Sequence, residues 1–169
     1  DSPEVFEDVQ MNGTTGTATA NTYVIIHRMS VVTYNISGVN RGIITAEWGL
    51  GNVTAQINLG WGQTEMALYG IPSTQTAYLT NWYASIQKAS GVNVDVNFRM
   101  LYSQFPATSP SLFVTKEIRG LQTNGTTEGL WMHNPYKTFT GPGILKVQAI
   151  GSAADIDCTA GFDLILLDN

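Results

Sequence analysis

Two carboxylates near the C-terminal end of the chain are spaced for metal binding, in Asp155-Ile156-Asp157. In an extended segment this spacing places both side chains on one side, where a hard cation such as Ca²⁺ could bridge them. The further oxygen ligands and the glycine of the usual calcium loop are absent from the surrounding sequence. A solvated turn is therefore the favoured interpretation, and we expect no bound metal and no cofactor.

A second pair of carboxylates, Glu47 and Glu65, could serve as the acid and base of a glycosidase. That chemistry needs carboxyl groups about 5–10 Å apart across a cleft, a spacing that a sequence does not reveal. The Gly-x-Ser-x-Gly turn of a serine hydrolase does not occur. Surface carboxylates are much more common than catalytic ones, so we expect no catalytic residues and no enzymatic activity.

The two histidines and the single cysteine are the remaining candidates for nucleophilic or ligand chemistry. His27 follows apolar residues, which favours a place within a strand, and His133 is expected in a loop beside Trp131 or Tyr136. Cys158 could form a dyad with either histidine only if the fold brings the two together. A small buried side chain is the more common role of such a cysteine. With one cysteine, the chain forms no internal disulfide.

The charge balance excludes two classes of partner. Eight Lys and Arg residues against thirteen Asp and Glu give a net charge of -5 and a pI near 4.8. No basic run offers the electrostatic footprint of nucleic-acid binding. The longest apolar runs, residues 23–26 and 164–167, are far shorter than the roughly 20 residues of a membrane span. We therefore expect neither nucleic acid nor membrane as a partner.

The elements that must position these residues are predicted to be strands. The chain has 169 residues, of which 43% are hydrophobic and only 12% charged, which suits one polar-surfaced all-β domain. Residues 1–21 are expected to be an arm or linker, and residues 22–169 an antiparallel β-sandwich of jelly-roll type. An immunoglobulin-like sandwich stays open as the alternative. The predicted strands are residues 22–34, 42–48, 53–59, 65–71, 76–87, 92–102, 111–121, 144–150 and 160–167.

Period-two patterns suggest how some of these strands are placed. Val94, Val96 and Phe98 alternate with polar residues, which predicts one buried and one wet face. Tyr78, Trp82 and Ile86 are expected on one face of the preceding strand. The short link over residues 88–91 predicts that these two strands are antiparallel neighbours. Residues 160–167 are apolar on both faces and are expected inside a sheet, whereas 103–110 and 120–134 are expected to be exposed loops.

Several segments resemble a group of tailed-phage virion proteins that is common among marine and cyanobacterial phages. The resemblance lies in Tyr69-Gly70-Ile71-Pro72 with the following residues 76–82, in residues 28–31 and 38–44, and in the ending Ala160-Gly161-Phe162-Asp163-Leu164-Ile165-Leu166-Leu167-Asp168-Asn169. Together these cover most of the chain from about Tyr23. The family's usual members carry a further β-rich region ahead of this part, and residues 103–110 depart from the family's pattern.

The resemblance implies a structural component of the virion. Our first expectation is a capsid decoration or cement protein, which sits on the major capsid protein and stabilises the shell. The alternative is a tail-fibre or receptor-binding domain that contacts host glycans through exposed loops. A glycan-active enzyme that uses two of the carboxylates is a third hypothesis.

The shortage of charge also suggests self-association. A chain with few ions and several large aromatic residues has more neutral surface than a monomer usually leaves in water. We therefore expect a symmetric homo-oligomer, specifically a homotrimer. Trp61, Tyr136 and Phe139 are the expected interface residues, because they lie in segments flanked by Gly or Pro and outside the main alternating strands.

Overall fold

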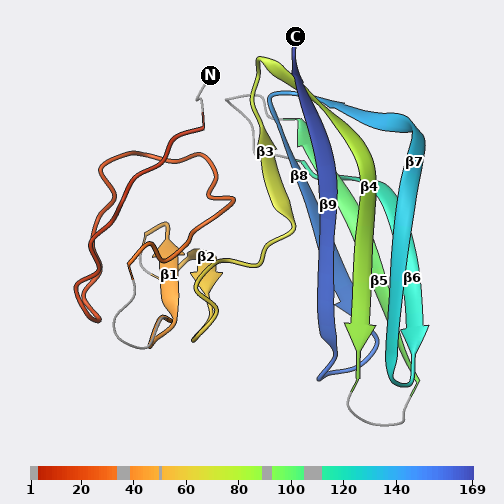
Figure 1. Ribbon diagram of the computed structural model, residues 1–169, viewed down its shortest axis with the longest axis horizontal. Coiled ribbons are helices and arrows are strands. Elements are labelled where there is room, and N and C mark those ends of the chain that lie inside the picture. Colours follow the sequence, from red (N-terminus) through yellow and green to blue (C-terminus); the bar gives the residue numbers. More distant parts are fainter. Residues whose placement is uncertain (1–3, 34–38, 50, 89–92, 105–111) are drawn as a thin grey trace. The chain divides into compact units, whose positions relative to one another are not determined.

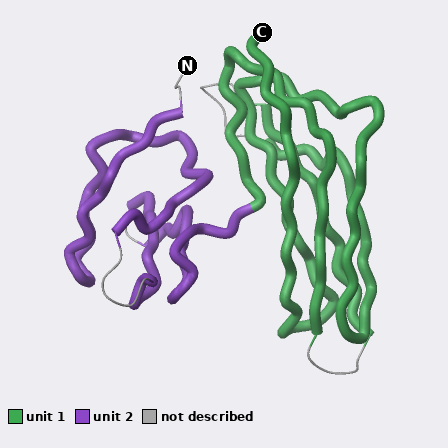
Figure 2. Tube along the Cα trace, viewed as in Figure 1, with its two compact units in different colours: residues 1, 67–169 green, residues 2–66 purple. Residues whose placement is uncertain are grey.

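The chain forms two compact units, called here the first and the second in sequence order (Figure 2). The first unit, residues 2–66, is labelled unit 2 in the figure, and the second unit, residues 67–169, is labelled unit 1. The computed structural model describes residues 4–33, 39–49, 51–88, 93–104 and 112–169. The sandwich expected over residues 22–169 is confined to the second unit, because residues 22–66 belong to the first. The boundary therefore differs from the one expected at residue 21.

The second unit is an antiparallel β-sandwich, which confirms the predicted fold class. One sheet has the order β3-β8-β5-β6 and the other the order β7-β4-β9. Figure 1 shows the three strands of the second sheet in front of the first. The strand bounds are β3 (Leu68–Ile71), β4 (Gln75–Gln87), β5 (Val94–Gln104), β6 (Val114–Thr123), β7 (Thr126–Thr140), β8 (Gly143–Gly151) and β9 (Asp157–Asp168).

The order of the strands does not confirm the jelly-roll type. In the described part of this unit, a sheet of four strands packs against a sheet of three strands. In an immunoglobulin-like sandwich of seven strands, the second strand pairs with the fifth and the third pairs with the sixth. The same pairs occur here, counted from β3, as β4–β7 and β5–β8. The outer strands differ from that plan, because β3 pairs with β8 and β9 pairs with β4.

Strand β4 is the centre of its sheet, as its two apolar faces indicate, but a bulge changes which residues face the core. The register shifts between Leu79 and Asn81 in the pairing with both neighbours. Leu79 and Trp82 are therefore both buried. The expectation that Tyr78 shares a face with Trp82 is wrong, because the extra residue Thr80 inverts the alternation at this point.

Strands β4 and β5 are not hydrogen-bonded neighbours, contrary to the prediction from the short link between them. They lie in different sheets, and their inner faces meet in one core of Trp82, Phe98 and other buried side chains. A short link is compatible with either a hairpin or a crossing between two packed sheets. The wet and dry faces of β5 are as predicted, since Val94 and Val96 are buried and Asp95 is exposed.

The longest strand of the sandwich, β7, lies mostly where an exposed loop was expected. It begins at Thr126 and pairs with β4 along both halves of its length. Gly129, Asn134 and Pro135 within it are typical of turns, which explains the wrong prediction. Its pairing with β4 is interrupted near Pro135, which has no N–H to donate.

Two other strand predictions are also wrong. Residues 22–33 form no strand, and their only bridge joins Ser30 to Gln63. An apolar alternating run becomes a strand only when it finds a partner along its length. Strand β9 lies at the edge of its sheet and not inside it, so that Ile165 and Leu167 on its outer face stay exposed.

The first unit contains one hairpin, made by β1 (Ile44–Glu47) and β2 (Val53–Ile57). Most of the remaining described residues of this unit are irregular. Asn40 is 7% exposed and connects three parts of this region: its Nδ2 donates to the carbonyls of Gly42 and Asn58, and its Oδ1 accepts from the Gly62 N–H. No helix within the described residues is long and apolar enough to cross a membrane.

The alternation of buried and exposed residues along β5 can be tested by substitutions on its two faces. Val96→Asp places an unpaired carboxylate in the core, and we expect it to cost several kcal/mol of unfolding free energy, on the order of 3 or more. Asn97→Asp changes an exposed position and should cost less than about 1 kcal/mol. Thermal melts of both variants measure the difference. Equal loss in the two variants would contradict the inner and outer faces described for β5.

Candidate functional site

The sandwich holds a partly buried ionic group, here called the Glu117 cluster, made of Glu117, Arg119, His133, Lys137 and Trp82. The carboxylate of Glu117 is at its centre and only 10% exposed. Lys137 Nζ donates to Glu117 Oε2 at 2.9 Å, Arg119 Nε donates to Oε1 at 2.7 Å, and the indole N–H of Trp82 donates to Oε1 at 3.3 Å. His133 Nε2 lies 3.5 Å from Oε2.

Two edge strands supply the charged members of this cluster. Glu117 and Arg119 lie on β6, opposite the buried Met100 and Phe98, and Lys137 on β7 lies opposite the buried Leu79. These side chains therefore point toward the interior between the sheets. Inward-pointing charges on edge strands are a known protection against edge-to-edge aggregation. Here opposite charges from the two edges meet, so the cluster joins one sheet to the other.

The electrostatics of Glu117 favour a permanent carboxylate. Burial by itself would raise the pKa of Glu117, but the hydrogen bonds from Lys137 and Arg119 and the positive charge of Lys137 outweigh that effect. The pKa is therefore held below its ordinary value of 4.5. A carboxylate in this state accepts hydrogen bonds and does not donate a proton near neutral pH, so the cluster is built to hold the fold together.

The carboxylates singled out in the sequence are not members of this cluster. Asp155 has a left-handed φ of 57° in the turn before β9, and its carbonyl, with that of Ala154, accepts a hydrogen bond from Lys88 Nζ. In the described ranges, no three His, Cys, Asp or Glu side chains gather as a metal-binding group. Glu47 accepts a hydrogen bond from the Gly51 N–H within the turn after β1.

The histidines and the cysteine form no dyad in the described structure. His27 Nε2 is 3.0 Å from Glu4 Oε1 in the first unit. Cys158 is level with Ile86 and Thr127 in the sheet, not with His133. It is exposed and not buried as expected. Burial of its sulfur and the charge of Asp157 nevertheless raise the pKa of the Cys158 thiol, which lowers its reactivity near neutral pH.

The outer surface of the sheet β7-β4-β9 carries a set of large apolar side chains, here called the outer apolar face. Its residues are Tyr83, Leu130, Met132, Ile165 and Leu167, all of them exposed. Tyr83 is level with Leu130 on one side and with Gly161 on the other, and its ring lies close over Gly161. The residues therefore extend across all three strands of the sheet.

The three expected interface residues have different surroundings. Phe139 is only 3% exposed and packs in the core beside Tyr102, with ring centroids 5.1 Å apart. An interface role does not fit Phe139, because its surface is already buried within its own chain. Tyr136 and Trp61 are both about half exposed. Tyr136 and Phe139 lie within β7, so their expected place in a loop is wrong.

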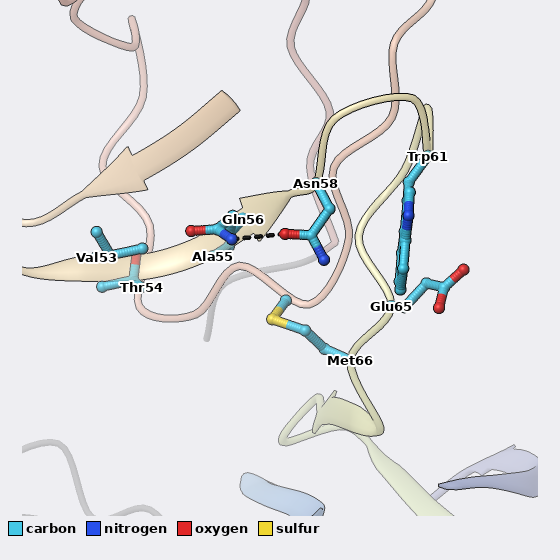
Figure 3. A pocket seen from close by; sticks show the side chains of 8 residues that line it. All are labelled: Val53, Thr54, Ala55, Gln56, Asn58, Trp61, Glu65 and Met66. Atoms are coloured by element: carbon cyan, nitrogen blue, oxygen red, sulfur yellow. Dashed lines mark hydrogen bonds between the residues drawn. The ribbon is translucent and has the colours of Figure 1, made fainter. Parts of the chain in front are cut away.

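Trp61 lines a shallow hollow of about 290 Å³ in the first unit, here called the Trp61 pocket. Its other lining groups include Thr54, Gln56, Asn58, Glu65 and Met66. Gln56 Nε2 donates to Asn58 Oδ1 at 2.7 Å. Figure 3 shows the indole edge-on, with its flat face turned toward Asn58 and Met66. Of the two carboxylates considered as a glycosidase pair, only Glu65 is among the described residues that line it.

The sequence contains weak signals for the Glu117 cluster. In Lys116-Glu117-Ile118-Arg119, Glu117 and Arg119 are two residues apart and lie on the same side of a predicted strand. Two charges on the inner side of a strand do not fit a purely apolar core, so they indicate a polar contact there. The pairing of Glu117 with Lys137 depends on β7, which the sequence pattern does not predict as a strand.

Comparison with known proteins adds no assignment, because no family model, no curated protein and no solved structure matches this chain.

The Glu117 cluster predicts a specific pH dependence of stability. Because the pKa of Glu117 is lowered on folding, its contribution is present above its ordinary value of 4.5 and is lost as pH falls through the lower folded pKa. We expect Glu117→Gln to lower the unfolding free energy by about 1–3 kcal/mol at pH 7, and to remove this part of the acid dependence. Urea unfolding at pH 7 and at lower pH values measures both effects.

Glu128→Gln is the matched control, since Glu128 lies exposed on β7. It should change the free energy of unfolding by less than about 0.5 kcal/mol at every pH. If Glu117→Gln behaved like this control, the cluster would not contribute to stability.

Proposed function

We propose that this chain is a structural protein of a phage virion, a capsid decoration or cement protein that docks on the shell with the outer apolar face. The observation that carries the proposal is this face. Met132 is 79% exposed, and Leu130 on the same strand and Ile165 and Leu167 on β9 are also largely in water. Contiguous exposed apolar residues on a folded sheet are characteristic of protein-binding surfaces.

The charges on this surface indicate the kind of partner. Glu128 on β7 and Asp157 and Asp163 on β9 share the outer side of the sheet with the outer apolar face. Among the described outward-facing residues of these three strands there is no Lys or Arg. A surface of exposed apolar and acidic side chains is complementary to an apolar patch that also carries basic residues. We therefore assign it to a shell protein and not to an identical face on a second copy.

The chemistry of the ionisable groups supports a structural role. The buried carboxylate of Glu117 is already bound by two cations and an indole N–H. The raised pKa of the Cys158 thiol disfavours the nucleophilic thiolate near neutral pH. Neither group is poised as the nucleophile or proton donor that a glycan-active or hydrolytic enzyme requires.

The proposal is tested with particles that contain the chain and particles that lack it. We expect depleted particles to release their genome at a lower temperature, as followed by the fluorescence of a DNA-binding dye. Added wild-type protein should restore the heat resistance. Met132→Asp should not restore it, because it places a charge at the centre of the docking surface, and its binding to the shell should fall by about tenfold or more.

Ile118→Asp is the matched control, because Ile118 is also an exposed apolar residue but lies on β6 of the other sheet. It should restore heat resistance as well as the wild type does. Unchanged heat resistance together with lost adsorption to host cells would contradict the cement role and favour the receptor-binding alternative. Equal restoration by Met132→Asp would exclude the outer apolar face as the docking surface.

The proposed assembly is a homotrimer. A cyclic trimer joins two different surfaces of each chain, which leaves the outer apolar face free for the shell. Sedimentation at micromolar concentrations should give a species of three times the chain mass of 18.3 kDa. A species of monomer mass alone at all concentrations would exclude an autonomous trimer.

A further inference from the structure

We infer that the Trp61 pocket binds a neutral pyranose sugar. This inference is separate from the proposed docking function, because it uses the first unit and different residues. The argument depends on an exposed aromatic ring, two amide side chains and the charges around them.

The backbone around Trp61 is held in place, while Trp61 itself is half exposed and outside the hydrophobic core. Its side chain is 52% exposed, although the loop that carries it is tied down on both sides. The backbone N–H of Trp61 donates to the Asn58 carbonyl. The glycines on either side, Gly60 and Gly62, have left-handed φ angles of 80° and 71°. An exposed indole on a fixed loop provides a flat apolar surface with little loss of entropy on binding.

The buried side chain of Asn40 fixes this loop. Its Oδ1 accepts from the Gly62 N–H at 3.0 Å, its Nδ2 donates to the Asn58 carbonyl at 2.8 Å, and its own carbonyl accepts from the Gly60 N–H. Three connections from one buried residue thus hold the chain before and after Trp61. Such support from behind a binding residue is what a preformed site requires.

Two amides that line the same pocket as Trp61 offer a paired donor and acceptor. Gln56 Nε2 donates to Asn58 Oδ1, which leaves Gln56 Oε1 as an acceptor and Asn58 Nδ2 as a donor without a partner in the described part of the chain. Each hydroxyl of a sugar is both a donor and an acceptor. Two neighbouring hydroxyls of a pyranose therefore match this pair, while the C–H groups of its apolar side lie on the indole.

The charge and size of the Trp61 pocket select among ligands. Glu65 is the charged group among its described lining residues, which include no Lys or Arg. This disfavours phosphates and acidic sugars. A single aromatic ring is not a cage for a quaternary ammonium ion. The volume of about 290 Å³ is just below the usual range for pockets that hold drug-sized ligands, which suits one sugar ring or the end of a glycan.

The test uses the full chain and the methyl glycosides of glucose, galactose, mannose and N-acetylglucosamine. We expect at least one of these sugars to bind with a dissociation constant of about 1 mM. In a ¹⁵N-labelled sample, its titration should shift the side-chain amide signals of Gln56 and Asn58. Trp61→Ala should weaken binding by about fivefold or more, whereas Trp61→Phe should retain a measurable part of it. Absence of binding by all four glycosides overturns the proposal.

Trp48→Ala is the matched control, since Trp48 is another exposed tryptophan of the first unit and is 78% exposed. It should bind the sugar as the wild type does. Equal loss in both tryptophan variants, or tighter binding of N-acetylneuraminic acid than of the neutral glycosides, would also overturn the assignment. Binding of the disaccharide of the preferred sugar at higher affinity than its methyl glycoside identifies a glycan chain as the source of the ligand.

Discussion

The strict alternation of side chains across a β-sheet is the constraint on which this structure depends. Once Leu79 and Trp82 are placed in the core, the residues that alternate with each of them on β4 must face outward. The bulge at Thr80 makes this arrangement possible, because it lets both residues face inward despite their odd spacing. Tyr83 is left on the outside by the same geometry. The outer apolar face is thus a consequence of the way in which the core is filled.

The side of the sandwich bounded by β6 and β7 is closed by ion pairs in addition to apolar packing. Glu117 takes part in the inner layer only because Lys137, Arg119 and Trp82 satisfy its oxygens. Removing any one partner leaves part of a buried charge uncompensated, which is more costly than never having buried it. The arrangement links strands from both sheets and gives the two edges a polar character that opposes pairing with other chains.

The two units present surfaces of different chemistry. The sandwich exposes an apolar face with acidic residues on the same side, which suits a protein partner. The first unit exposes the indole of Trp61 in a pocket that also contains the amides of Gln56 and Asn58, which suits a sugar. A virion protein that stabilises the shell and also holds host or environmental glycans would use both. The two roles are separable by mutation, since Met132 and Trp61 belong to different units.

The sequence by itself determined the fold class, the absence of disulfides and the two faces of β5, because these follow from composition and from period-two patterns within one segment. It did not determine the partners of the strands, since alternation is the same in a central strand and at an edge. The tertiary structure therefore decided that β9 lies at an edge, and it revealed β7 behind residues typical of turns. Only folding brings Glu117 to Lys137 and Asn40 to Gly62, because residues distant in sequence interact only after the chain has paired its strands and closed its loops.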